Sequence, residues 1–344
     1  MVYVGMAVSS KSFVVHAVNE RKRVVWRGEV AATPSGLKRA MAALGEHTKL
    51  VVFEAGNQMK WIARELGRLK GVRLHIVHPN EVKWISQSSG KTDKVDARKL
   101  AELARGDLLP RKVHVVEGPV RELRELVGAR HTLQSKRVAL MNTLRGYLKQ
   151  EGQRLPEKFF GRTDWQAALA KLEVGASTQQ IVASFKGGIE ALAHAEGELT
   201  RRIVAIKDRR IELLESIPSI GELSARVLLG ALDEAKRFDN KKCVAKYGAL
   251  SPRIYQSGDV VHLGRINRDG RQELRRVLLQ CAHTLTRMRS PGARPLRAFF
   301  ERVLKRRGKK IAIVALARKL LTTAYGVLKA GAFYDPDKLL PVAA

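Results

Sequence analysis

The first third of the chain alternates between short strand-like and helix-like patterns of apolar residues. Residues 2–8, 12–18 and 23–30 are rich in valine, phenylalanine and tryptophan between short polar breaks, which predicts three successive strands. The apolar spacing that follows predicts helices at 34–44, 57–70, 79–87 and 93–105, and strands at 50–53 and 72–77. We therefore expect an α/β domain over residues 1–109.

The order of these elements is similar to the ribonuclease H-like fold, in which a mixed sheet presents carboxylates at strand ends and on a late helix. Glu54 directly follows the predicted strand 50–53, and Asp93 and Asp96 are spaced so that both lie on one face of a helix. Clustered carboxylates repel one another until a divalent cation binds, and two Mg²⁺ ions about 4 Å apart support phosphoryl transfer. The alternative is that Asp93 only begins the helix and favours its positive end, with Asp96 solvated.

The middle of the chain, residues 110–210, has a heptad pattern. Apolar residues recur every seven positions in two series, Leu126, Leu133, Leu140 and Tyr147, and later Leu192, Leu199, Ile206 and Leu213. Two such helices predict a coiled-coil arm that either folds back on itself or pairs between protomers. Because polar residues interrupt both series, we expect a modest interface; they are Arg130, Arg137, Glu196 and Arg210. Residues 159–188 read as short helices and loops.

Residues 211–344 predict a mainly helical C-terminal domain. Residues 211–230 read as a helix, a tight turn and a second helix after Gly221, similar to a helix-hairpin-helix. In that motif the turn amides and the next helix N-terminus bind a phosphate. Ser219 occupies the usual place of the first glycine, so a purely structural helical hairpin is the alternative. Further helices are expected at 274–287, 296–305 and 309–328.

Between these helices, residues 247–275 contain repeated glycines and predict loop and turn structure. Ser257 stands immediately before Gly258 within a strongly basic stretch. A hydroxyl among guanidinium groups suits attack on a phosphodiester, because arginines hold and neutralise phosphate oxygens. An ordinary turn serine in a basic surface loop is the alternative. The arginines expected to bind nucleic acid are Arg253, Arg265, Arg268, Arg271 and Arg275.

The charge of the chain narrows the class of partner. The 344 residues contain 64 lysines and arginines against 33 aspartates and glutamates, a net charge of +31 that indicates a nucleic acid partner. A membrane surface is the competing partner, but we find no lipidation motif, no signal peptide and no apolar run of about 18 residues. Two cysteines form no disulfide framework or zinc site, so we expect reduced thiols in a cytoplasmic protein.

Two separated sets of motifs resemble one known family, the DEDD transposases of bacterial insertion sequences. These are serine recombinases guided by a bridge RNA, and the Piv-type DNA invertases are related to them. The first set comprises residues 4–9, 52–55 and 91–98. The second comprises residues 217–221, Phe238, residues 247–252, Ser257-Gly258, residues 264–266, Gly270 and Leu274-Arg275.

The resemblance implies a RuvC-like N-terminal domain with four carboxylates that bind Mg²⁺. Glu54, Asp93 and Asp96 match the second, third and fourth of them. It further implies that Ser257 is the nucleophile, that the active site is composite between protomers of a dimer or tetramer, and that a structured guide RNA pairs with donor and target DNA.

Ala7 stands where the family has its first aspartate. The missing carboxylate removes one metal ligand, so we expect impaired metal binding and catalysis with folding and nucleic acid binding kept. An inactivating substitution made to stall the enzyme, or a natural degenerate copy, would explain Ala7. Two other functions stay open: a junction-resolving nuclease that uses water and the carboxylates alone, and an inactive nucleic-acid-binding transposase remnant.

Overall fold

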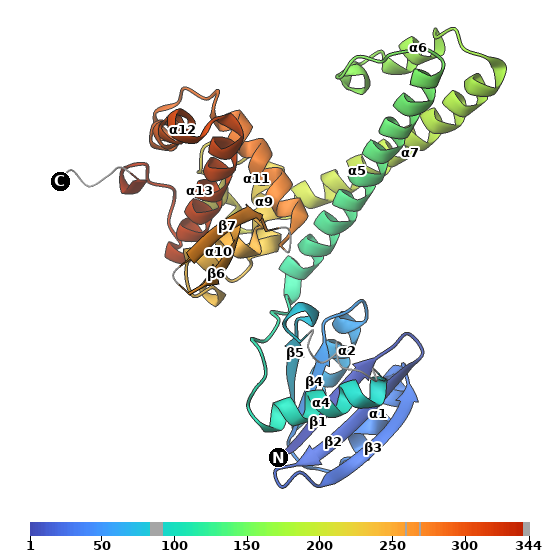
Figure 1. Cartoon of the computed structure of the whole chain (residues 1–344), viewed down its shortest axis with the longest axis vertical. Coiled ribbons are helices and arrows are strands. Elements are labelled where there is room, and N and C mark those ends of the chain that lie inside the picture. Colours follow the sequence, from blue (N-terminus) through green and yellow to red (C-terminus); the bar gives the residue numbers. More distant parts are fainter. Residues whose placement is uncertain (83–91, 259, 268–269, 340–344) are drawn as a thin grey trace. The chain divides into compact units, whose positions relative to one another are not determined.

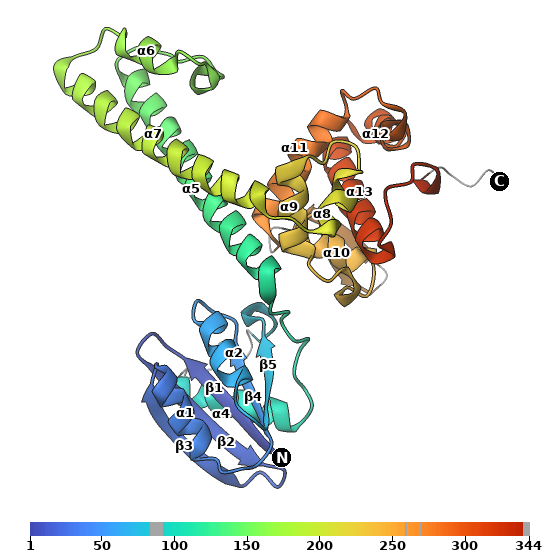
Figure 2. The ribbon, with the colours of Figure 1, turned by 180° about the vertical axis from the view of Figure 1, so that it is seen from behind.

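The computed structural model describes residues 1–82, 92–258, 260–267 and 270–339, with only the backbone of residues 254, 257, 261, 263 and 339. The chain divides into two compact units, Met1–Val115 and Val116–Ala344, which are described separately. Figures 1 and 2 show the elements of each unit from opposite sides.

The first unit is built on a five-stranded mixed sheet in the order β3-β2-β1-β4-β5. Strands β1 (Val2–Val8), β2 (Ser12–Asn19) and β3 (Val24–Ala31) form the predicted antiparallel meander. Strands β4 (Lys49–Glu54) and β5 (Val72–Val77) continue the sheet in parallel with β1. The structure therefore confirms a mixed sheet consistent with a RuvC-like domain.

Helices cover both faces of this sheet. Helices α1 (Pro34–Ala42) and α2 (Met59–Gly67) share a core with Val4, Met6 and Phe53 on one face. Helix α4 (Asp93–Arg105) packs Leu100 and Leu103 against Val52 and Val77 on the other face. The alternation of side chains along each strand assigns neighbouring residues to opposite cores.

Only the start of one predicted helix of this unit lies within the described residues. The proline-led helix expected at 79–87 begins as a single 3₁₀ turn, η1 (Pro79–Glu81). Pro79 fixes a backbone angle suited to a helix start, but it does not make the turn continue. Residues 83–87 of that prediction lie outside the described residues.

In the second unit, two long helices form an arm that is folded back on itself. Helices α5 (Gly118–Gln150) and α7 (Ala176–Ala205) pack side by side (Figure 2). A small separate core closes the tip around η2 (Phe159–Gly161) and α6 (Trp165–Ala170). Of the two predicted arrangements for the arm, the intramolecular one is formed in this chain.

The second heptad series lies beside the fully buried positions of α7, and its residues Leu192 and Leu199 are half-buried. The buried series of α7 is Val182, Ile189, Glu196 and Ile203, not the predicted series that begins at Leu192. The helix also begins before Gly188 and ends at Ala205, because Ile206 is extended and Asp208 caps the next helix. The leucine spacing could not reveal this, since Glu196 occupies a buried position that periodicity assigns to an apolar residue.

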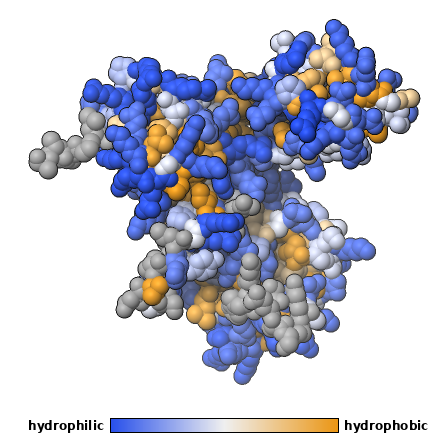
Figure 3. Space-filling view, turned by 45° about the horizontal axis from the view of Figure 1, so that its top comes forward, coloured by the Kyte–Doolittle hydropathy of each residue, from blue (hydrophilic) through white to orange (hydrophobic). Residues whose placement is uncertain are grey.

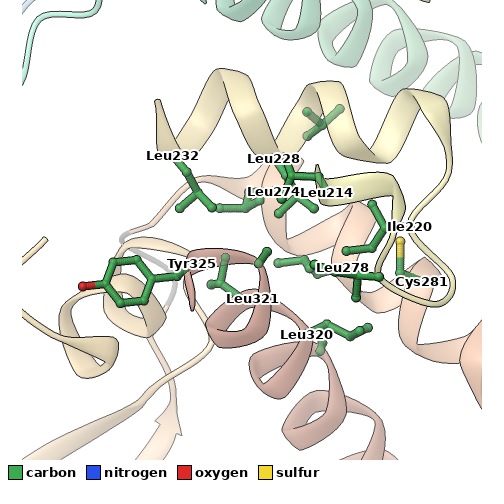
Figure 4. Packing of buried hydrophobic residues seen from close by; sticks show 14 of the residues in the cluster. Leu214, Ile220, Leu228, Leu232, Leu274, Leu278, Cys281, Leu320, Leu321 and Tyr325 are labelled. Carbon is green, nitrogen blue, oxygen red and sulfur yellow. The ribbon is translucent and has the colours of Figure 1, made fainter. Parts of the chain in front are cut away.

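The rest of this unit is a helical body with one large core. Helices α8 (Arg209–Glu215) and α9 (Glu222–Leu232) form the predicted hairpin, followed by η3 (Ala235–Arg237) and α10 (Lys241–Tyr247). Helix α11 (Gln272–Leu285), η4 (Pro291–Ala293), α12 (Arg294–Arg307), α13 (Lys309–Ala330) and η5 (Asp337–Leu339) complete it. Figure 4 shows apolar side chains of α8, α9, α11 and α13 meeting at the centre.

Helix α13 corrects one expectation about hydropathy. Within the described residues it is the one helix long and apolar enough to cross a membrane by length and composition, although no such run was found in the sequence. Its residues Leu316, Leu320 and Leu321 are fully buried in the core. A buried core helix accounts for this composition.

The glycine-rich stretch is also more ordered than predicted. Strands β6 (Pro252–Ser257) and β7 (Val260–Ile266) pair as an antiparallel hairpin where loop and turn were expected. Gly258 marks the turn of the hairpin, but Pro252 and Gly264 lie within the strands themselves. Asn267 N–H donates to the carbonyl of Ser251 at 2.9 Å and closes the base of the hairpin.

Candidate functional site

A pocket of about 470 Å³ in the first unit collects the predicted carboxylate positions. Ala7, Glu54, Asp93 and Asp96 all line it. Strands β1 and β4 run parallel with Met6 opposite Phe53, so the next residues, Ala7 and Glu54, reach the same sheet edge. The sequence spacing alone predicts that Asp93 lies beside Asp96. The parallel pairing of β1 with β4 then brings Ala7 and Glu54 together.

Helix α4 reaches this edge because β1 has a glycine beneath it. A Cβ on Gly5 would lie 1.9 Å from the carbonyl oxygen of Ala97 and 2.6 Å from the amide nitrogen of Ala101. The helix thus rests directly on the strand backbone, an approach that any side chain would block. Thr92 caps the helix by accepting from the amide of Val95 at 3.3 Å, so Asp93 starts its first turn.

Two polar contacts hold the rim of the pocket. The Ser9 hydroxyl accepts from the amide of Ser12 at 3.1 Å and fixes the turn after β1. The Gln58 side chain donates to the Ser9 carbonyl and ties that turn to the segment after β4. Ser9, Asn57 and Gln58 also line the pocket, although they were not among the predicted site residues. The available signal was a run of polar residues directly after each buried strand.

The donor chemistry of the pocket suits a hard cation, but its ligand set is incomplete. Asp96 Oδ1 is buried and has no hydrogen-bond partner in the structure. An unpaired buried carboxylate oxygen is costly unless a proton or cation satisfies it. In the part of the chain that the structure describes, no three acidic, histidine or cysteine side chains are grouped closely enough to hold a metal. The side chain of Ala7, which also lines this pocket, has no atom that could bind a metal.

Ser257 belongs to the second unit, at the end of β6. Its backbone pairs with Val260, and Gly258 follows with φ of +58°, a left-handed conformation that glycine adopts without strain. Its side chain lies outside the described residues. Ser257 thus occupies the corner of a hairpin, a position that only the strand pairing reveals.

The arginines that were predicted to bind nucleic acid differ in their exposure to solvent. Arg253 and Arg265 are exposed on the hairpin, whereas Arg271 and Arg275 are half-buried and Arg268 lies outside the described residues. Arg271 forms an ion pair with Glu273.

The α8–α9 turn contains one residue in a left-handed conformation. Ser219 has φ of +75°, so it adopts the glycine-like conformation of the position it occupies, and its buried hydroxyl has no partner. Gly221 is the N-cap of α9, and no side chain caps the helix there. Free amides at a helix start can bind an anion.

Comparison with known proteins shows which family combines these features. A model of the "Transposase IS116/IS110/IS902 family" matches residues 211–297, and a DEDD-type IS110 transposase model matches residues 4–152. The chain belongs to the DEDD-type transposases of insertion sequences. The first family match includes Gly221 and Ser257, and the second includes Ala7, Glu54, Asp93 and Asp96.

Individual relatives agree with this family. A protein named "Probable family 20 transposase" from Pseudomonas aeruginosa is 26% identical over 97% of this chain and 98% of its own length. The transposase for insertion sequence element IS1111A of Coxiella burnetii is 25% identical over 92% of this chain and 86% of its own. The pilin gene-inverting protein of Moraxella bovis is 34% identical over 37% of this chain and 39% of its own. Membership of this transposase family implies that the protein is an enzyme that recombines DNA.

Proposed function

We propose that this transposase is the scaffold of a magnesium-dependent, RNA-guided recombinase whose nucleophile is Ser257, and that Ala7 impairs its catalysis. The pocket that gathers Glu54, Asp93 and Asp96 around Ala7 is the observation that carries the proposal. Three of the four carboxylate positions of the family meet there in a family member, and the fourth is the one that lacks its carboxylate.

Glu54, Asp93 and Asp96 would hold the Mg²⁺ ions of this site. Bound Mg²⁺ neutralises phosphate oxygens and stabilises both the attacking and leaving oxygens of a phosphoryl transfer. Ala7 and Gly5 are two residues apart on β1, so both face the side covered by α4. An aspartate at residue 7 would therefore face the start of α4, where Asp93 and Asp96 lie.

Ser257 supplies the covalent step of the proposal. Its hydroxyl oxygen attacks a phosphodiester phosphorus, a phosphoserine bond forms, and the bond to one DNA oxygen breaks as that oxygen leaves with a proton. Attack by a free hydroxyl of another DNA strand on the phosphoserine then releases the serine and joins the strands. The exposed Arg253 and Arg265 on the same hairpin supply positive charge for the phosphate oxygens.

Guide RNA and self-association are further parts of this proposal. They are supported by the resemblance in two separated regions and by a net charge of +31, since a protein that leaves sequence choice to base pairing needs mainly backbone contacts. We expect a dimer or tetramer. The measurement is light scattering of the purified chain with and without the RNA of its element.

The decisive experiment is a denaturing gel that detects DNA covalently attached to the protein. The unsubstituted chain, which has Ala7, is compared with the variant Ala7→Asp. Each is incubated with element RNA, target DNA and Mg²⁺. We expect an adduct only with Ala7→Asp, and its loss in the double variant Ala7→Asp, Ser257→Ala. Restored aspartate without DNA cleavage would contradict the assignment of Ala7.

Two outcomes of the same gel would support the other functions. Cleavage without an adduct, unaffected by Ser257→Ala, would indicate a junction nuclease that uses water. Tight binding with neither cleavage nor adduct would indicate a nucleic-acid-binding remnant. Ala7 is the observation that favours the remnant, because a natural copy no longer under selection for catalysis can lose a metal ligand.

A further inference from the structure

Three arginines from distant parts of the second unit gather around one tyrosine. Arg124 of α5 donates to the Tyr247 hydroxyl at 3.3 Å. The Arg237 guanidinium carbon lies 4.8 Å from the centre of the Tyr247 ring and 3.9 Å from that of Phe238. The Arg271 amide donates to the Tyr247 carbonyl at 3.0 Å. We refer to Arg124, Arg237, Arg271 and Tyr247 as the arginine cluster.

The backbone around the cluster is shaped for this approach. A Cβ on Gly270 would lie 2.5 Å from both the Tyr247 carbonyl oxygen and the Ala249 amide nitrogen. Only glycine allows these two segments to come so close, and the contact brings Arg271 to Tyr247. Arg237 is fixed as well, because it donates to the carbonyls of Ala231 and Leu232 at 3.2 and 3.3 Å.

The cluster concentrates positive charge in a place with limited access to water. Burial lowers the pKa of the Arg124 and Arg237 guanidiniums, and their neighbouring arginines lower it further. The Glu273 carboxylate partly offsets this lowering of the Arg124 pKa, and it also forms an ion pair with Arg271. The Asp233 carboxylate does the same for the pKa of Arg237, and it also pairs with Arg210 at 3.7 Å. Half-buried like charges that repel one another are stabilised by an anion.

We propose that the arginine cluster is a binding site for one backbone phosphate of a nucleic acid. Planar guanidiniums suit phosphate because each can donate two parallel hydrogen bonds. Stacking on Tyr247 and Phe238 and hydrogen bonding to Tyr247 hold two of the three groups in place before the phosphate arrives, which reduces the entropy lost on binding. A backbone phosphate is the same at every nucleotide, so the proposed contact is independent of sequence.

This site is separate from the chemistry proposed for Ser257. Tyr247 precedes β6 and Arg271 follows β7, so the cluster lies at the base of the hairpin, whereas Ser257 lies at its turn. At the usual rise per residue, the length of β6 amounts to about 17 Å. The phosphate held by the cluster is therefore not the one that Ser257 would attack, and the proposal stands whether or not Ser257 is the nucleophile.

The first test uses inorganic phosphate and three forms of the full chain. Arg124→Gln removes a cluster guanidinium, and Arg121→Gln removes an arginine on the same helix that pairs instead with Glu125 at 3.1 Å. We expect phosphate, compared with chloride at equal ionic strength, to raise the melting temperature of the original chain and of Arg121→Gln, and to raise that of Arg124→Gln by less than half as much. An equal phosphate response in all three forms, or none, would overturn the proposal.

A purely structural role is distinguished by a milder change. Tyr247→Phe keeps the ring that Arg237 stacks on and removes only the hydroxyl that accepts from Arg124. If Arg124→Gln does not fold, this variant is measured in its place and should also lose at least half of the phosphate response. A lowered melting temperature with an unchanged phosphate response would show that the cluster only holds the fold together.

The second test identifies the source of the phosphate. Binding of a DNA duplex and of a single-stranded RNA is measured by fluorescence anisotropy over a series of salt concentrations. Loss of one contact reduces the slope of log K against log salt by about 0.9 for duplex DNA or about 0.7 for a single strand. We expect Arg124→Gln to show this reduction with one of the two nucleic acids, and that nucleic acid is the ligand. Unchanged slopes with both would refute the site.

Discussion

At the residue scale, Gly5 and Ala7 determine what can happen beneath helix α4. Gly5 lets the helix rest on β1, which brings Asp93 and Asp96 to the pocket. Ala7, on the same side of the strand, contributes no carboxylate to that pocket. One position therefore controls the geometry of the site and the other its charge.

Replacement of Gly5 by alanine should destabilise the first unit. The new methyl group would meet the backbone of α4, which cannot move away as a flexible side chain would. Overpacking of this kind costs about 1–3 kcal/mol. Urea unfolding followed by circular dichroism measures the loss. The control is Gly67→Ala at the end of α2, where a Cβ meets no atom within 4 Å and stability should be unchanged or slightly higher. Equal stability of the two variants would contradict the packing role of Gly5.

Restoring the carboxylate at residue 7 should make the stability of the chain depend on Mg²⁺. In Ala7→Asp we expect a metal concentration near 100 times the dissociation constant to stabilise by about 2.7 kcal/mol. Without metal the added charge should instead lower stability, because it lies among other carboxylates. Thermal melting with Mg²⁺ or a chelator measures both effects, and adding Asp96→Asn should remove most of the gain. A gain of similar size in the chain as given would show that Ala7 does not limit metal binding.

At the element scale, the arm is held in register by a charged group where the heptad pattern requires an apolar one. Glu196 of α7 is only 8% exposed and lies 2.8 Å from Arg130 and 2.9 Å from Arg137, both on α5. Three of the four polar residues that were predicted to weaken the interface thus pair with one another across it, whereas the fourth, Arg210, lies on α8 and pairs with Asp208. A buried charged group of this kind fits one alignment of the two helices and disfavours shifted ones.

Removing only the Glu196 carboxylate should destabilise the arm more than replacing all three charged residues by apolar ones. Glu196→Gln leaves two arginines without their carboxylate, and we expect a loss of about 1–3 kcal/mol, less than for a fully buried pair because the arginines are 20% and 24% exposed. Replacing Arg130, Glu196 and Arg137 together by methionine, leucine and methionine should be neutral or stabilising. Guanidinium unfolding compares the two variants. A triple variant as unstable as Glu196→Gln would show that the charges themselves stabilise the arm.

At the scale of the whole molecule, positive charge is distributed rather than confined to one tail. The net charge of +31 comes from residues along the entire sequence. The face shown in Figure 3 is predominantly hydrophilic, with small apolar patches between polar side chains. The turn between α12 and α13 is an example, since Lys305, Arg306, Arg307, Lys309 and Lys310 are all exposed. Such a surface binds polyanions through many weak contacts.

Nucleic acid binding should therefore weaken steeply with salt. Each phosphate contact with duplex DNA contributes about −0.9 to the slope of log K against log salt, so a footprint of six or more contacts predicts a slope steeper than about −5. Filter binding at several salt concentrations measures it. Replacing Lys309 and Lys310 by glutamine should make the slope shallower by up to about 1.8 if both contact phosphate. Binding that is insensitive to salt would exclude the basic surfaces as the main contacts.

Elements whose residues signal their structure locally could be predicted from the sequence. The strands of the first unit, helix α4 and the α8–α9 hairpin follow from alternation, helical spacing and caps, which act over a few neighbouring residues. The same holds for the total charge and for the spacing of Asp93 and Asp96. The hairpin β6–β7 was missed because its short strands contain Pro252 and Gly264, and the fully buried series of α7 was not identified because a buried glutamate interrupts the apolar pattern.

The tertiary structure alone decided what depends on residues far apart in the chain. Parallel pairing of β1 with β4 sets Ala7 beside Glu54, and the contact of Gly5 with Ala97 adds the aspartates of α4. Periodicity carries no information about which strands pair or how closely a helix approaches a sheet. Glu196 likewise becomes a buried partner of Arg130 and Arg137 only when the arm folds back. Arg124, Arg237 and Arg271 meet at Tyr247 because packing of the helical body joins them, a proximity that no local pattern encodes.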